Sequence, residues 1–288
     1  MRSVLAVVAA VLALPLPAVS AVAAPAMAAE EQAAIDRLAR EIVGTETASM
    51  AKARRIIDWL NANFVWTDTD YGRRSLVEII ERRGGNCAEQ ARVARALMTA
   101  AGIRTRQIAE VNIQPESPQR QKDAEEVVAQ YGASASVFGL AHNDHRWLEV
   151  FDETTESWQP ADPTLGLVGV EQWMRARVGF GARPVHHILP SRDMLVPVAI
   201  FALPEDGSFE TATDRTGFYL VEQFGGLYGE ALTTQPEWAQ WRERVQALSP
   251  VISQAFQGTV NLHTRAGDLK AAGDLYRALQ AKLEGAGK

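Results

Sequence analysis

The sequence contains one cysteine in 288 residues, Cys87, and five histidines. A thiol attacks carbonyl carbons when a base beside it takes its proton, and a third group commonly orients that base. Cys87, His145 and Asp162 are of the residue types that these three roles require. The residues around each of them predict whether the fold can bring the three side chains into contact.

Cys87 follows features that are typical of a helix start. Asn86 is a favourable N-cap residue, and Glu89 completes a pattern like a capping box. Free N–H groups and the helix dipole favour a negative charge at this place, so we expect a thiolate with a lowered pKa. Gly84 and Gly85 let the backbone turn sharply before the cysteine. The N–H of Cys87 is a candidate donor to an oxyanion.

A structural role for Cys87 is the alternative, because a free cysteine is often a small buried core residue. Exported proteins usually use cysteines in pairs, as disulfides, and a lone cysteine has no partner within its chain. The position of Cys87 after two glycines and at a helix start favours the reactive thiol.

His145 and Asp162 lie at the ends of two predicted strands. His145 opens the strand 146–151. A short turn, 152–157, leads to the strand that starts at 158–160 and runs into Asp162. Adjacent antiparallel strands place the start of the first beside the end of the second, so we predict that Asp162 lies next to His145. His142 and His145 also allow a metal pair, but no further ligands at a recognisable spacing accompany them. No metal and no cofactor is therefore predicted.

The periodicity of apolar residues predicts the elements that position these groups. A polar insertion from Pro115 to Leu140 interrupts them, and the chain beyond Pro204 reads as mostly helical. Helices followed by strands indicate an α+β fold. The predicted helices are 30–43, 49–64, 75–82, 87–101 and 170–178, and the predicted strands are 105–113, 146–151, 158–160 and 194–203.

The first residues are typical of a cleavable secretory signal peptide. Arg2 precedes an apolar stretch from Val4 to Leu16, and small residues follow it. Prolines interrupt the run before it reaches the roughly 20 apolar residues of a membrane anchor. We expect cleavage after Ala28 or Ala29, a periplasmic or secreted protein, and no membrane span after cleavage.

The charge distribution argues against partners that carry many negative charges. The formal net charge is −6, and the basic residues do not cluster. Nucleic acids and anionic membrane surfaces are therefore not expected as partners. About 260 residues remain after the signal, which suffices for one large domain or two small ones.

Three motifs together resemble the transglutaminase-like superfamily over about residues 49–166. The motifs are Arg83-Gly84-Gly85-Asn86-Cys87-Ala88-Glu89, His145-Arg146-Trp147-Leu148-Glu149-Val150 and Trp158…Asp162-Pro163-Thr164. That family has a papain-like fold, in which a helix with the nucleophile packs on an antiparallel sheet, and its motifs carry Cys, His and Asp in this order. The resemblance implies Cys87 as nucleophile, His145 as base and Asp162 as the orienting group.

The implied function is acyl transfer at an amide bond of a protein, peptide or peptide-like substrate. Cys87 forms a thioester, which water resolves in a protease or amidase and an amine resolves in a transamidase. Candidate substrate or oxyanion contacts are Trp66, Tyr71, Asn86 and Trp147.

Two other readings remain open. The motif around Cys87 also resembles that of arylamine N-acetyltransferases, but Ala88 stands where that family has a bulky residue, and acetyl-CoA is a cytosolic cofactor. A non-catalytic binding or scaffold protein of the same fold is the second alternative.

The predicted division of the chain has four parts. They are a signal peptide (1–29), an N-terminal helical segment (30–48), a catalytic core (49–170) and a mostly helical extension without a recognised match (171–288).

Overall fold

The computed structural model describes residues 29–67, 74–113, 144–180, 196–260 and 262–284. Three sequence predictions lie outside these residues: the signal peptide up to Ala28, the contact residue Tyr71 and the insertion 115–140. In the described part of the chain, no helix combines the length and the apolar character that crossing a membrane requires.

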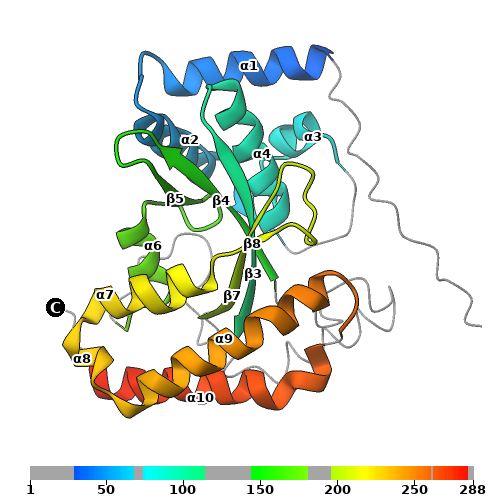
Figure 1. The fold of residues 1–288 in the computed structure, drawn as a ribbon. Coiled ribbons are helices and arrows are strands. Elements are labelled where there is room, and N and C mark those ends of the chain that lie inside the picture. The colour runs from blue at the N-terminus through cyan, green and yellow to red at the C-terminus, as the bar shows by residue number, and fades with distance from the viewer. Residues whose placement is uncertain (1–28, 68–73, 114–143, 181–195, 261, 285–288) are drawn as a thin grey trace, which may run out of the picture.

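One antiparallel sheet runs through the middle of the molecule (Figure 1), with the strand order β6-β5-β4-β3-β7-β8. β7 lies far beyond β3 in the sequence, yet the two strands pair along most of their length. Both halves of the chain therefore contribute to one sheet. The strands are β3 (Thr105–Ile113), β4 (Asp144–Asp152), β5 (Ser157–Asp162), β6 (Leu167–Val168), β7 (Val196–Leu203) and β8 (Thr213–Asp214).

The N-terminal helices cover one face of this sheet. They are α1 (Ala29–Val43), α2 (Ser49–Asn63), α3 (Leu76–Arg82) and α4 (Cys87–Ala100). Their apolar sides form one hydrophobic cluster with Leu148 and Val150 of β4. A short parallel pair, β1 (Val65–Trp66) and β2 (Gly84–Gly85), leads the chain into α4.

The C-terminal helices cover the opposite face, where α9 and α10 run side by side (Figure 1). A second hydrophobic cluster forms there around Trp147 of β4, Trp173 and Tyr219. The elements are α6 (Val170–Arg177), a π-helix η2 (Phe218–Gln223), α7 (Phe224–Tyr228), α8 (Glu230–Thr233), α9 (Pro236–Phe256), a 3-10 turn η3 (Leu262–Arg265) and α10 (Ala266–Leu283).

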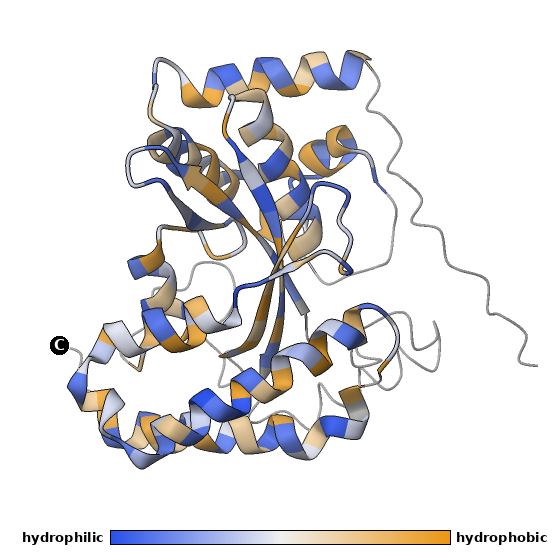
Figure 2. Ribbon diagram, viewed as in Figure 1, coloured by the Kyte–Doolittle hydropathy of each residue, from blue (hydrophilic) through white to orange (hydrophobic). Residues whose placement is uncertain are grey.

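Contacts with the C-terminal elements α9, α10 and η2 explain the composition of β7. Every residue of β7 is buried, and Figure 2 shows the strand in hydrophobic colours. Residues 196 and 198–202 all belong to the cluster that the C-terminal helices form. The strand therefore has no solvent side and no place for alternating polar residues. The predicted α+β fold, with a helix that begins at Cys87 packed on an antiparallel sheet and a helical C-terminal part, is confirmed.

Candidate active site

Cys87 is the first residue of α4, and a complete capping box begins that helix. The Asn86 side chain accepts the N–H of Glu89 at 3.0 Å, and the Glu89 carboxylate accepts the N–H of Asn86 at 3.1 Å. The N–H of a first helical residue has no acceptor within its own helix. The partly exposed thiol of Cys87 therefore lies at the positive end of the helix dipole.

The turn before Cys87 is held by side chains of the helix that it enters. Gln90 Nε2 donates to the carbonyl oxygen of Gly85 at 2.9 Å. A Cβ on Gly85 would lie 2.9 Å from Cβ of Glu89, so glycine is required at this position. Glu89 is itself buried, and Arg74 Nη1 donates to it at 3.0 Å, which supplies the countercharge.

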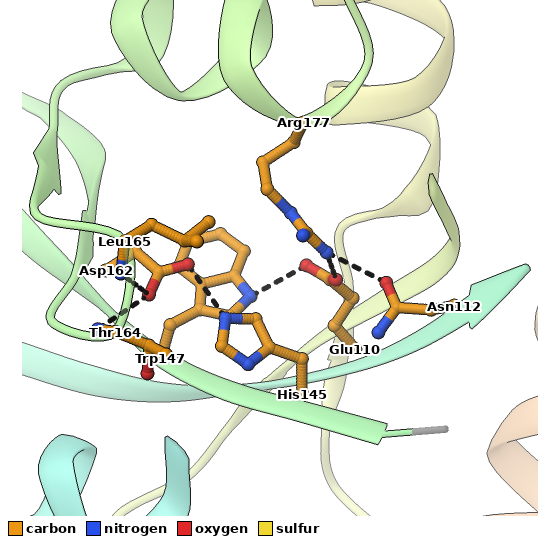
Figure 3. Close-up of polar contacts among 8 residues, drawn as sticks. All are labelled: Glu110, Asn112, His145, Trp147, Asp162, Thr164, Leu165 and Arg177. Atoms are coloured by element: carbon orange, nitrogen blue, oxygen red, sulfur yellow. Dashed lines mark hydrogen bonds and ion pairs between the residues drawn. The ribbon is translucent and has the colours of Figure 1, made fainter. Parts of the chain in front are cut away.

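His145 and Asp162 form a buried pair (Figure 3). His145 Nε2 lies 2.8 Å from Asp162 Oδ2. The other carboxylate oxygen, Oδ1, accepts the N–H groups of Thr164 at 3.1 Å and Leu165 at 3.3 Å. His145 lies near the start of β4 and Asp162 ends β5, so the predicted contact between these strand ends is confirmed.

The pKa of His145 is raised from 6.5 to about 10. Burial acts in the opposite direction, but the charge and hydrogen bond of Asp162 outweigh it, and a hydrogen bond and the charge of Cys87 add to them. The second ring nitrogen, Nδ1, points away from Asp162 in Figure 3. His145 is thus hydrogen-bonded to Asp162, and its raised pKa also reflects an interaction with Cys87.

The sequence comparison agrees with this geometry. Residues 36–163 match the profile of the Transglutaminase-like superfamily, and the match includes all three residues of the cluster. This stretch is a transglutaminase-like domain. No curated protein matches the sequence.

Solved structures give weaker likenesses. A candidate cysteine protease from Cytophaga hutchinsonii is 16% identical, with a TM-score of 0.36, over 64% of this chain and 46% of that chain. A candidate protease from Parabacteroides distasonis is 15% identical, with a TM-score of 0.32, over 47% of this chain and 25% of that chain. Rad4-Rad23 crosslinked to undamaged DNA is 12% identical, with a TM-score of 0.38, over 90% of this chain and 54% of that chain. The chain spans about half or less of these structures.

The residues predicted to contact the substrate or the oxyanion have three different environments in the structure. Trp66 is 37% exposed and pairs with Gly85 across β1 and β2, close to Cys87 in the chain. Asn86 uses its side-chain oxygen and its N–H in the helix cap. Trp147 is fully buried and donates its indole N–H to Glu110, so the prediction that it contacts substrate is wrong. It packs behind the histidine instead.

A buried polar network, absent from the sequence prediction, adjoins the His145–Asp162 pair (Figure 3). Glu110 contacts Arg177, and Arg177 Nη2 donates to Asn112 Oδ1 at 2.9 Å. Arg177 lies beyond the matched residues 36–163. A sequence signal for the network does exist: Glu110 shares the inward face of β3 with Ile108, where an acidic residue needs a buried partner.

The alternative of a metal pair rests on His142, which lies outside the described residues. Among the residues that the structure describes, no group of three or more His, Cys, Asp or Glu is placed to hold a metal ion.

Proposed function

We propose that this protein is an exported thiol enzyme that acts on amide bonds of proteins, peptides or peptide-like molecules through an acyl-enzyme at Cys87. The observation that carries the proposal is the 2.8 Å contact between His145 and Asp162, beside a cysteine at a helix start. The transglutaminase-like match supports it. The signal-like pattern at the N-terminus supports export.

In the first half-reaction, the Cys87 thiolate attacks the amide carbonyl, and a C–S bond forms. The oxyanion lies near the unoccupied N–H of Cys87, which donates to it at the positive end of α4. The C–N bond then breaks, and the amine leaves with the proton of His145. Asp162 keeps the imidazole oriented throughout.

In the second half-reaction, His145 takes a proton from the acceptor, and the acceptor attacks the thioester. Water gives a carboxylic acid, and an amine gives a new amide; both steps return the thiol of Cys87. Hydrolysis is favoured in a dilute extracytoplasmic space, because water is abundant there.

The test measures alkylation of Cys87 by iodoacetamide from pH 5 to 9 with mass spectrometry. We expect rapid labelling below about pH 7, well under the pKa of a free thiol, and slower labelling in His145→Ala and Asp162→Asn. Asp152→Asn is the matched control, because Asp152 is an exposed carboxylate at the other end of β4 that accepts from Thr154 and Thr155. Labelling that rises only above about pH 8 in every protein would favour a non-catalytic role.

A second readout separates the two acceptors. An activated ester such as p-nitrophenyl acetate should give a burst of p-nitrophenol and an acetyl group on Cys87. Added glycinamide then partitions the acyl-enzyme between acetate and the acetylated amide. Cys87→Ser should show neither the burst nor the adduct.

A further inference from the structure

A buried carboxylate that the proposed chemistry does not use lies beside His145. Glu110 is fully buried on β3, and the strand register places it directly opposite His145 of β4. Residues opposite one another on antiparallel strands have their Cβ atoms about 4.5–5.5 Å apart on the same face. Glu110 is thus within reach of the same imidazolium that Asp162 binds.

Two donors hold Glu110 away from the imidazole. Arg177 Nη2 contacts Oε1 of Glu110, and the indole N–H of Trp147 donates to Oε2 at 2.9 Å. Figure 3 shows Glu110 turned toward Arg177, while His145 is turned toward Asp162. Both oxygens of Glu110 therefore have partners other than the histidine.

Arg177 is the countercharge of this carboxylate. Its side chain is buried, and Asn112 fixes the guanidinium through a 2.9 Å hydrogen bond. A charge that is buried in a protein needs such a partner, and removal of one partner leaves the other uncompensated. The nearest cationic group that would remain for Glu110 on the neighbouring strand is the His145 imidazolium, directly opposite in the register.

We propose that Arg177 is a positioning residue of the active site. Because Arg177 binds Glu110, the carboxylate of Glu110 does not form an ion pair with His145. The imidazolium stays hydrogen-bonded to Asp162, and its Nδ1 stays directed at Cys87. Within the described ranges of the chain, the groups that face His145 are then Asp162 from β5, Cys87 from α4 and Glu110 from β3, which stays ion-paired with Arg177. The inference rests on the proposed function, and it assigns a role in catalysis to a segment outside the transglutaminase-like match.

The experiment compares pH profiles of Cys87 alkylation by iodoacetamide in the full-length wild type and variants. In Arg177→Met, Glu110 competes with Asp162 for the histidine, so labelling at pH 6 should fall roughly tenfold, equivalent to a shift of one pH unit. Adding Glu110→Gln removes the competing charge and keeps an acceptor for Trp147. The double variant should therefore label within about twofold of the wild type, as a coupled pair requires.

Circular dichroism checks folding, and Arg177→Gln replaces Arg177→Met if the latter does not fold.

The outcomes separate this inference from the proposed function. A normal wild-type profile with an unchanged profile in folded Arg177→Met overturns the inference alone. A double variant as slow as Arg177→Met also overturns it, because Arg177 would then act through packing only. A wild-type profile that rises only above about pH 8 overturns the proposed function and the inference together.

Discussion

His145 is buried, and the acidic groups around it still favour its protonated form. Asp162 contributes most to this preference, because its charge and its hydrogen bond both raise the pKa of the histidine against the effect of burial. The spacing of the two strand ends was enough to predict their contact. Glu110 and Arg177 could not be paired from sequence, because they come from distant segments and no motif links them.

The raised pKa of His145 predicts how stability depends on pH. The folded-state value of about 10 lies above the ordinary value of 6.5, so proton binding stabilises the folded form fully below about pH 6.5 and ceases to do so as pH rises through about 10. Urea unfolding of the wild type and of His145→Gln/Asp162→Asn, measured from pH 6 to 10, checks this. The stability difference between the two proteins should shrink steadily over the window. A constant difference would contradict the shift.

At the scale of elements, α4 shows how a local pattern places Cys87 at the first position of a helix. The capping box of Asn86 and Glu89 was readable from four consecutive residues, because its contacts are local. The strands β1 and β2 were not predicted, since two residues are too few for an alternating pattern. Their pairing places the exposed Trp66 beside Gly85, on the approach to the cysteine.

Loss of the cap of α4 should affect both stability and thiol chemistry. Asn86→Ala removes the acceptor for the N–H of Glu89 and should cost about 1 kcal/mol of unfolding free energy. Ser75→Ala is a matched control, because Ser75 forms the same capping box at the start of α3. Urea unfolding should show similar losses for both variants, whereas Cys87 alkylation at pH 6 should slow only in Asn86→Ala. Equal labelling rates would argue against a role for the helix start in activating the thiol.

At the scale of the whole molecule, the C-terminal half completes the structure that the matched domain begins. β7 pairs with β3 in the middle of the sheet, and the C-terminal helices bury the face that carries Trp147. The helical character of this half was predictable from its sequence. Its attachment to the sheet was not, because strand pairing between remote segments leaves no trace in local periodicity.

A chain that ends at Phe180 should therefore not fold on its own. It lacks β7 and the cover over Trp147 and Trp173, and each large apolar side chain contributes about 1.5–3 kcal/mol when it is fully buried. We expect no cooperative urea transition and no near-ultraviolet dichroism from this truncated chain, whereas a chain that ends at Glu284 should behave as the full length does. A cooperative transition in the shorter chain would show that the matched domain is autonomous.

The pairing of β3 with β7 also sets the order of events during folding. Gln107 pairs with Leu203, so the centre of the sheet closes only after a long stretch of chain has been made. Pairings between remote segments form slowly, since the entropy of the intervening loop is lost before contacts compensate for it. Ribosomes make Cys87, His145 and Asp162 well before the strand that completes their sheet. The newly made polypeptide therefore carries every group of the proposed catalytic site for some time before that site can be assembled.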